Sequence, residues 1–112
     1  MKIAIPTAKG TLCMHFGHCE VFSIFNVNSD TREIISREYL TPPPHEPGVL
    51  PAWLGEQNVN LIIAGGMGQH AQKLFAAQNI DVVVGAPTAA LEEVVKNYLA
   101  GTLSAGTNTC DH

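Results

Sequence analysis

The hydrophobic residues of the chain follow two patterns, continuous apolar runs and runs with helical spacing. Runs rich in β-branched and aromatic residues predict five strands, at 2–6, 21–27, 33–40, 60–66 and 80–86. Apolar residues three or four positions apart predict three helices, at 50–57, 69–78 and 88–101, with Thr88 as the cap of the last one and Gly101 as its stop. The turn-forming residues 28–31 predict that the second and third strands form an antiparallel hairpin.

This order of elements, a β-hairpin region followed by alternating helices and strands, predicts an α/β fold. We expect three α/β/α layers, in which helices cover both faces of a mixed five-stranded sheet. Strands 2–6, 60–66 and 80–86 should be parallel and central. The strand order is also that of ribonuclease H-like nucleases, but the first strand lacks the carboxylate that such enzymes place there for metal ions. A chain of 112 residues fits one domain, 1–112.

Composition narrows the classes of function. Hydrophobic residues make up 46% of the chain and charged residues 14%, which suits a sheet buried on both faces. The formal net charge is −4 and the six Lys and Arg residues are scattered along the sequence, so nucleic acid is not an expected partner. No apolar run approaches the about 18 residues needed to span a bilayer, and no signal peptide is visible. We expect a cytoplasmic protein without a membrane partner.

The segment 13–19, CMHFGHC, concentrates metal-binding residue types between the first two long strands. If the chain is extended there, Cys13 and His15 point to one side, and Gly17 permits a turn that returns Cys19. Cys110 and His112 repeat the same spacing at the end of the chain. Thiolate and imidazole are preferred by iron–sulfur species, zinc and copper. The candidate metal ligands are Cys13, His15, His18, Cys19, Cys110 and His112, and each cysteine could instead be a small buried hydrophobe.

Other chemistries of the same cysteines remain open. A structural zinc site could join Cys13, Cys19, Cys110 and one histidine, and such closed sites contribute directly to folding. A thiol sensor or redox enzyme would need a cysteine of depressed pKa. A cysteine-based phosphatase is disfavoured, because that motif needs an arginine six residues after Cys13 and position 19 is cysteine.

A second motif is GMGQHA at 66–71, which matches the glycine pattern of dinucleotide-binding turns between a strand and a helix. The acidic residue expected about 20 positions later is missing, because Asp81 stands at the start of the next strand instead. What the motif does predict is a close backbone approach to a ligand and a helix N-terminus that favours anions. His70 would then lie in the first turn of that helix, as a ligand contact or a surface residue.

Two longer stretches carry a family resemblance. HFGHCEVFSIF at 15–25 and the segment 62–103 resemble the dinitrogenase iron–molybdenum cofactor-binding family. The resemblance implies a non-enzymatic carrier of an iron–sulfur, iron–molybdenum or molybdenum–copper sulfide cluster, with a cluster-donor or acceptor protein as partner. It also implies a ribonuclease H-like fold without a nuclease site.

The resemblance implies roles for residues at two places in the chain. His15 matches the histidine of the family's HFG motif and is its candidate ligand, and Phe16 and Gly17 complete the motif. Gly65, Gly66 and Gly68 would offer backbone N–H groups to the cluster. The sequence departs from the minimal family pattern by adding Cys13, His18, Cys19, Cys110 and His112. Three interpretations of these additions stay open: tighter ligation, a different metal, or no role in binding.

Overall fold

The computed structural model describes residues 1–8, 10–12, 21–28, 30–42, 49–86 and 90–101. Its elements, in chain order, are β1 (Lys2–Ala8), β2 (Thr11–Leu12), β3 (Val21–Asn28), β4 (Glu33–Leu40), α1 (Val49–Glu56), β5 (Leu61–Ile63), α2 (Gln69–Ala77), β6 (Asp81–Val83) and α3 (Leu91–Ala100). All five predicted strands and all three predicted helices are present, so the α/β fold is confirmed. The two-residue strand β2 was not predicted.

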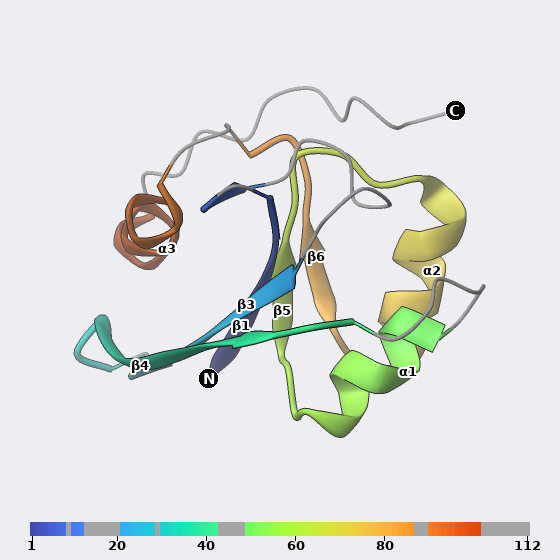
Figure 1. The fold of residues 1–112 in the computed structure, drawn as a ribbon, viewed down its shortest axis with the longest axis horizontal. Coiled ribbons are helices and arrows are strands. Elements are labelled where there is room, and N and C mark those ends of the chain that lie inside the picture. Colours follow the sequence, from blue (N-terminus) through green and yellow to red (C-terminus); the bar gives the residue numbers. More distant parts are fainter. Residues whose placement is uncertain (9, 13–20, 29, 43–48, 87–89, 102–112) are drawn as a thin grey trace.

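The strands form one mixed sheet in the order β4-β3-β1-β5-β6, and β2 pairs with the end of β1 (Figure 1). β1, β5 and β6 are parallel, while β3 is antiparallel to both β1 and β4, so the predicted hairpin is confirmed. Among the described strands β6 ends the sheet, which makes the prediction of a central position for it wrong. Both hairpin strands lie on the same side of β1, so among the described strands only β5 has a parallel neighbour on each side.

Helices cover both faces of the sheet, as predicted: α3 lies on one face and α1 and α2 lie on the other (Figure 1). The alternation of side chains along β1 directs Ile3 and Ile5 to the α3 face and Ala4 to the opposite face. The α3 face buries Leu91, Val94 and Val95 against the sheet. The α1–α2 face buries Leu50, Leu54 and Phe75. The three-layer architecture is therefore confirmed, and the ribonuclease H-like assignment stays a prediction.

The residues predicted for the two ends of α3 are confirmed in part. Glu92 and Glu93 lie in its first turn, where carboxylates interact favourably with the helix dipole. Gly101 is the C-cap with φ of 75°, a left-handed conformation that glycine adopts without strain. The N-cap is Ala90, and the predicted capping residue Thr88 lies outside the described residues.

A buried pair of hydroxyls joins β1 to β3 near the carboxyl end of β1. Thr7 is 2% exposed and Ser23 is fully buried, and their Oγ atoms are 2.8 Å apart. The Thr7 hydroxyl also donates to the Ile5 carbonyl at 2.8 Å. A hydroxyl has one proton, so Ser23 is then the donor to Thr7. The pair satisfies two polar groups that would otherwise be buried without a partner.

We expect Thr7→Val to lower the free energy of unfolding by about 1–3 kcal/mol, because it leaves the Ser23 hydroxyl buried without Thr7 as acceptor. Ser23→Ala should cost less, since Thr7 keeps its bond to Ile5. The double variant should lose less free energy of unfolding than the sum of the two single losses, because no hydroxyl of the pair is left buried without its partner. Urea denaturation of the four proteins measures this coupling. Additive effects would contradict it.

Candidate functional site

The parallel strands place two glycine-containing turns next to each other at one edge of the sheet. β5 leads into Gly65 and Gly66, and β6 leads into Gly85. The Gly85 N–H donates to the Gly65 carbonyl at 2.9 Å, and the Ala86 N–H donates to the Ala64 carbonyl at 3.2 Å. These bonds continue the β5–β6 pairing beyond the two strands and fix the turns relative to each other.

The turn between β5 and α2 is fixed by core packing and by hydrogen bonds from α2. Met67 is 1% exposed and packs in the core with Phe75. The Gln72 side chain donates from Nε2 to the Met67 carbonyl at 2.9 Å, and the Gln72 N–H donates to the Gly68 carbonyl at 3.1 Å. Gln72 therefore fixes the turn through both its side chain and its backbone. Sequence reasoning missed this role, because the contact of the Gln72 side chain with the Met67 carbonyl cannot be read from residue spacing.

The start of α2 is suited to binding an anion. Gly68 is the N-cap, with φ of −65° and ψ of 156°, and no side chain caps the helix. The first N–H groups of an α-helix lack intrahelical acceptors and lie at the positive end of its dipole. No Asp or Glu occurs between residues 61 and 80, and Asp81 is at the amino end of β6, away from this turn. The turn therefore presents amide and imidazole groups rather than carboxylates.

The described candidate residues differ in accessibility. Gly65 and Gly66 are buried, Gly68 is half-buried and His70 is exposed in the first turn of α2. The other candidates lie outside the described residues: Cys13, His15, Phe16, Gly17, His18, Cys19, Cys110 and His112. Within the described ranges, no three His, Cys, Asp or Glu residues come close enough to hold a metal ion. The proposed ligand set is thus not tested by this structure.

The attachment of the segment 13–20 is nevertheless defined by its two neighbours. Leu12, in β2, and Val21, in β3, both pair with Thr7 of β1. They do so from opposite sides, because β2 lies on the side of β1 where β5 pairs and β3 lies on the other. The described residues on either side of 13–20 therefore both lie at the carboxyl end of β1. This is the edge where β5 and β6 also end, since the three strands are parallel.

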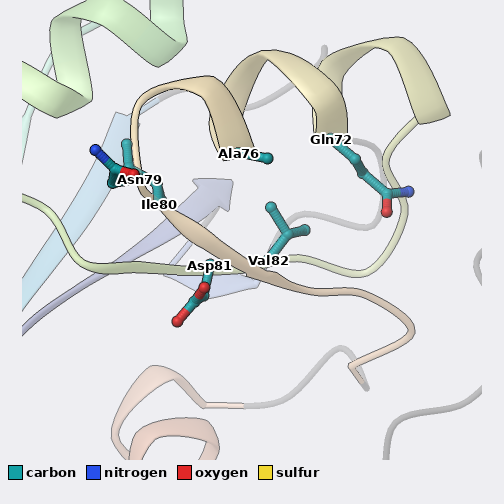
Figure 2. Close-up of a pocket in the computed structure, with 6 residues that line it drawn as sticks. All are labelled: Gln72, Ala76, Asn79, Ile80, Asp81 and Val82. Carbon is teal, nitrogen blue, oxygen red and sulfur yellow. The ribbon is translucent and has the colours of Figure 1, made fainter.

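A separate open groove of 420 Å³ lies between α2 and the outer edge of β6. Figure 2 shows Gln72 and Ala76 on α2 above Asn79, Ile80, Asp81 and Val82. These lining residues include no cysteine or histidine, and the only charge among them is the Asp81 carboxylate. The groove is therefore not suited to the metal–sulfur ligand that the sequence suggests.

Gly85 connects the two turns through its hydrogen bond to the Gly65 carbonyl. Its φ is 79°, a left-handed conformation that costs an L-residue about 1–2 kcal/mol. We expect Gly85→Ala to lower the free energy of unfolding by that amount and to shift the amide resonances of Gly65 and Gly66. Gly101→Ala is the matched control, because Gly101 has a similar φ of 75° and open space around it. It should cost similar stability without moving those resonances, and identical spectra for the two variants would refute the coupling.

The three-layer fold and the glycine turn place this chain among small α/β proteins, and open α/β sheets in general bind ligands at the carboxyl edge of their strands. The family model of the dinitrogenase iron-molybdenum cofactor matches residues 1–101. The chain belongs to this family, so the resemblance seen in the sequence is confirmed. No helix in the described ranges is long and apolar enough to cross a membrane.

The chain is also similar to individual proteins. The chain is 34% identical over 108 residues to the uncharacterized protein MJ0580 of Methanocaldococcus jannaschii, covering 92% of this chain and 89% of that one. The crystal structure of PH0822 superposes with a TM-score of 0.85 at 24% identity, covering 94% of each chain. The apo form of the orange protein of Desulfovibrio gigas superposes with a TM-score of 0.73 at 18% identity, covering 96% of this chain and 93% of that one. At these identities the two structures show a shared fold.

Proposed function

We propose that the protein is a carrier that binds a preformed metal–sulfur cluster, hands it to a partner protein in the cytoplasm and catalyses no reaction of its own. The observation that carries the proposal is the position of the residues that flank 13–20. Leu12 and Val21 pair with Thr7 at the sheet edge where the glycine turn 65–68 lies, and this supports a shared site. Membership of the dinitrogenase iron-molybdenum cofactor family supports a cluster as the cargo.

The two segments would divide the work of binding. His15, with Cys13 and Cys19, would supply ligands to metal atoms, while Phe16 and Gly17 shape the segment around them. Gly65, Gly66 and Gly68 would bring backbone N–H groups to sulfides, and His70 would lie at the rim. Such a set fits an anionic cluster, because amide and imidazole donors stabilise negative charge and the turn has no carboxylate. His18, Cys110 and His112 are further ligands in this proposal.

The direct test is an ultraviolet–visible spectrum with metal and sulfide analysis of anaerobically purified protein. The protein is measured before and after incubation with iron, sulfide and thiomolybdate. We expect sulfide-to-metal charge-transfer bands and a fixed ratio of iron, molybdenum or copper to protein. The melting temperature should stay nearly the same in the colourless form, because the described core consists of apolar side chains packed between the sheet and the helices.

One result would replace the carrier by the structural zinc site of Cys13, Cys19, Cys110 and a histidine. In that case the spectrum has no charge-transfer bands, each chain retains one zinc ion, and a chelator lowers the melting temperature sharply. The two proposals thus predict different absorption spectra and a different effect of metal removal on the melting temperature.

A further inference from the structure

Half of the basic residues of this acidic protein gather in one groove. Arg32, Arg37 and Lys96 line an open groove of 540 Å³ between β4 and α3, together with Glu33, Ile34 and Glu92. The chain has only six Lys and Arg residues and a net charge of −4. The groove holds three cations against two carboxylates, so its net charge is opposite in sign to that of the whole protein. We call it the β4–α3 groove.

Arg37 lines both this groove and a hollow next to it, and it contacts residues of the sheet and of α3. Its guanidinium bonds Glu92 of α3 at 2.7 Å and lies 5.8 Å from the centre of the Phe25 ring and 5.4 Å from that of Tyr39. Within the described residues, Arg32 and Lys96 have no ion-pair partner. Their charges are therefore available to a ligand, whereas the charge of Arg37 is paired with Glu92.

β4 carries two exposed apolar side chains, and one of them, Tyr39, lines a hollow next to this groove. Of the described residues, the large hydrophobic side chains that are exposed are Met1, Ile35 and Tyr39, and the last two lie on β4, 62% and 52% exposed. A second hollow of 330 Å³ continues past Arg37 and is lined by Gly10, Arg37, Tyr39, Ala90, Leu91 and Glu92. Arginine and tyrosine beside an apolar residue are typical of the residues that dominate protein interfaces.

We propose that the β4–α3 groove docks an acidic, partly apolar segment of a partner protein. Carboxylates of the segment would meet Arg32 and Lys96, and its apolar side chains would cover Ile35 and Tyr39. A second copy of this chain fits less well, because a bulge breaks the register of β4 and Arg37 and Glu38 discourage edge pairing. The proposal does not depend on the cluster site, since no residue of the groove belongs to it.

The test is a titration of ¹⁵N-labelled protein with a capped peptide of sequence ELEELE, followed by amide chemical shifts. We expect shifts along β4 and the first turns of α3 that weaken as ionic strength rises and the screening length falls from about 30 Å to about 3 Å. The charge-reversed peptide KLKKLK should not bind the groove. Free glutamate and inorganic phosphate are titrated in parallel.

Two variants remove one charge each with little change to the fold. Lys96→Gln is at an exposed helix position. Arg32→Asn replaces a residue at φ of 60° by one that tolerates this conformation better. Each should weaken peptide binding about two- to fivefold, the effect of one exposed ion pair. Lys73→Gln is the matched control, because Lys73 is exposed on α2 on the other face of the sheet, and it should leave binding unchanged.

The outcomes separate the possible occupants. Shifts confined to the groove, weakened by Lys96→Gln and Arg32→Asn but not by Lys73→Gln, support the proposal. It is overturned if the peptide does not bind, if the control weakens binding equally, or if glutamate or phosphate binds as tightly as the peptide. Concentration-dependent dimerisation through β4 without peptide would also overturn it, in favour of a second copy.

Discussion

Phe75→Ala is expected to lower the free energy of unfolding by about 3–5 kcal/mol, the usual cost of deleting a buried aromatic side chain. Phe75 is fully buried and is the only residue of α2 with that degree of burial. It packs with Met67, whose carbonyl the Gln72 side chain holds. Loss of the ring therefore removes the main attachment of α2 to the sheet and loosens the glycine turn as well.

Chemical denaturation followed by circular dichroism measures this effect. Phe75→Leu should cost clearly less, since most of the buried volume is retained. Tyr39→Ala is the exposed aromatic control, and because Tyr39 is 52% exposed its cost should be small. A loss of less than about 1 kcal/mol in Phe75→Ala would show that α2 is held by other contacts.

The elements that sequence reasoning predicted correctly are those whose apolar pattern is long or strongly periodic. β1, β3 and β4 have seven or eight residues each, and their patterns were sufficient. β2 was missed because two residues carry no periodicity, and it depends on its pairing with Thr7 and Ala8 and on a bridge from Thr11 to Ala90. The edge position of β6 was missed because three consecutive valines look the same in a central strand and in an edge strand covered by α2 on one face.

The site was predictable to the extent that it depends on local motifs. The glycine turn followed from the GMGQHA pattern, whereas its fixation by Gln72 and its bond to Gly85 depend on contacts that no spacing reveals. The β4–α3 groove was invisible for a similar reason. Arg32, Arg37 and Lys96 are scattered in the sequence, and only the packing of α3 beside β4 brings them together. The ligand roles of the two cysteine–histidine segments stay predictions.

The largest functional effect is expected from His15→Ala, which should abolish the charge-transfer bands of the reconstituted protein. Changes to residues that merely support metal ligands cost about 10- to 100-fold in affinity, and loss of a direct ligand should cost more. The fold should be retained, since the two described core clusters are formed by residues of the sheet and helices outside 13–20. His45→Ala is the matched control, because His45 belongs to the proline-rich segment 41–48 and is not among the proposed ligands.

The comparison of His15→Ala with cysteine variants then identifies the type of ligation. If His15 is the principal ligand, Cys13→Ser and Cys19→Ser should retain part of the metal and shift the bands, because sulfides of the cluster itself still contribute. If both cysteine variants lose all metal while His15→Ala retains it, ligation is by thiolate and the family's histidine has no role in this chain. Retention of the full spectrum in all three variants would place the cluster elsewhere and remove the segment 13–19 from the site.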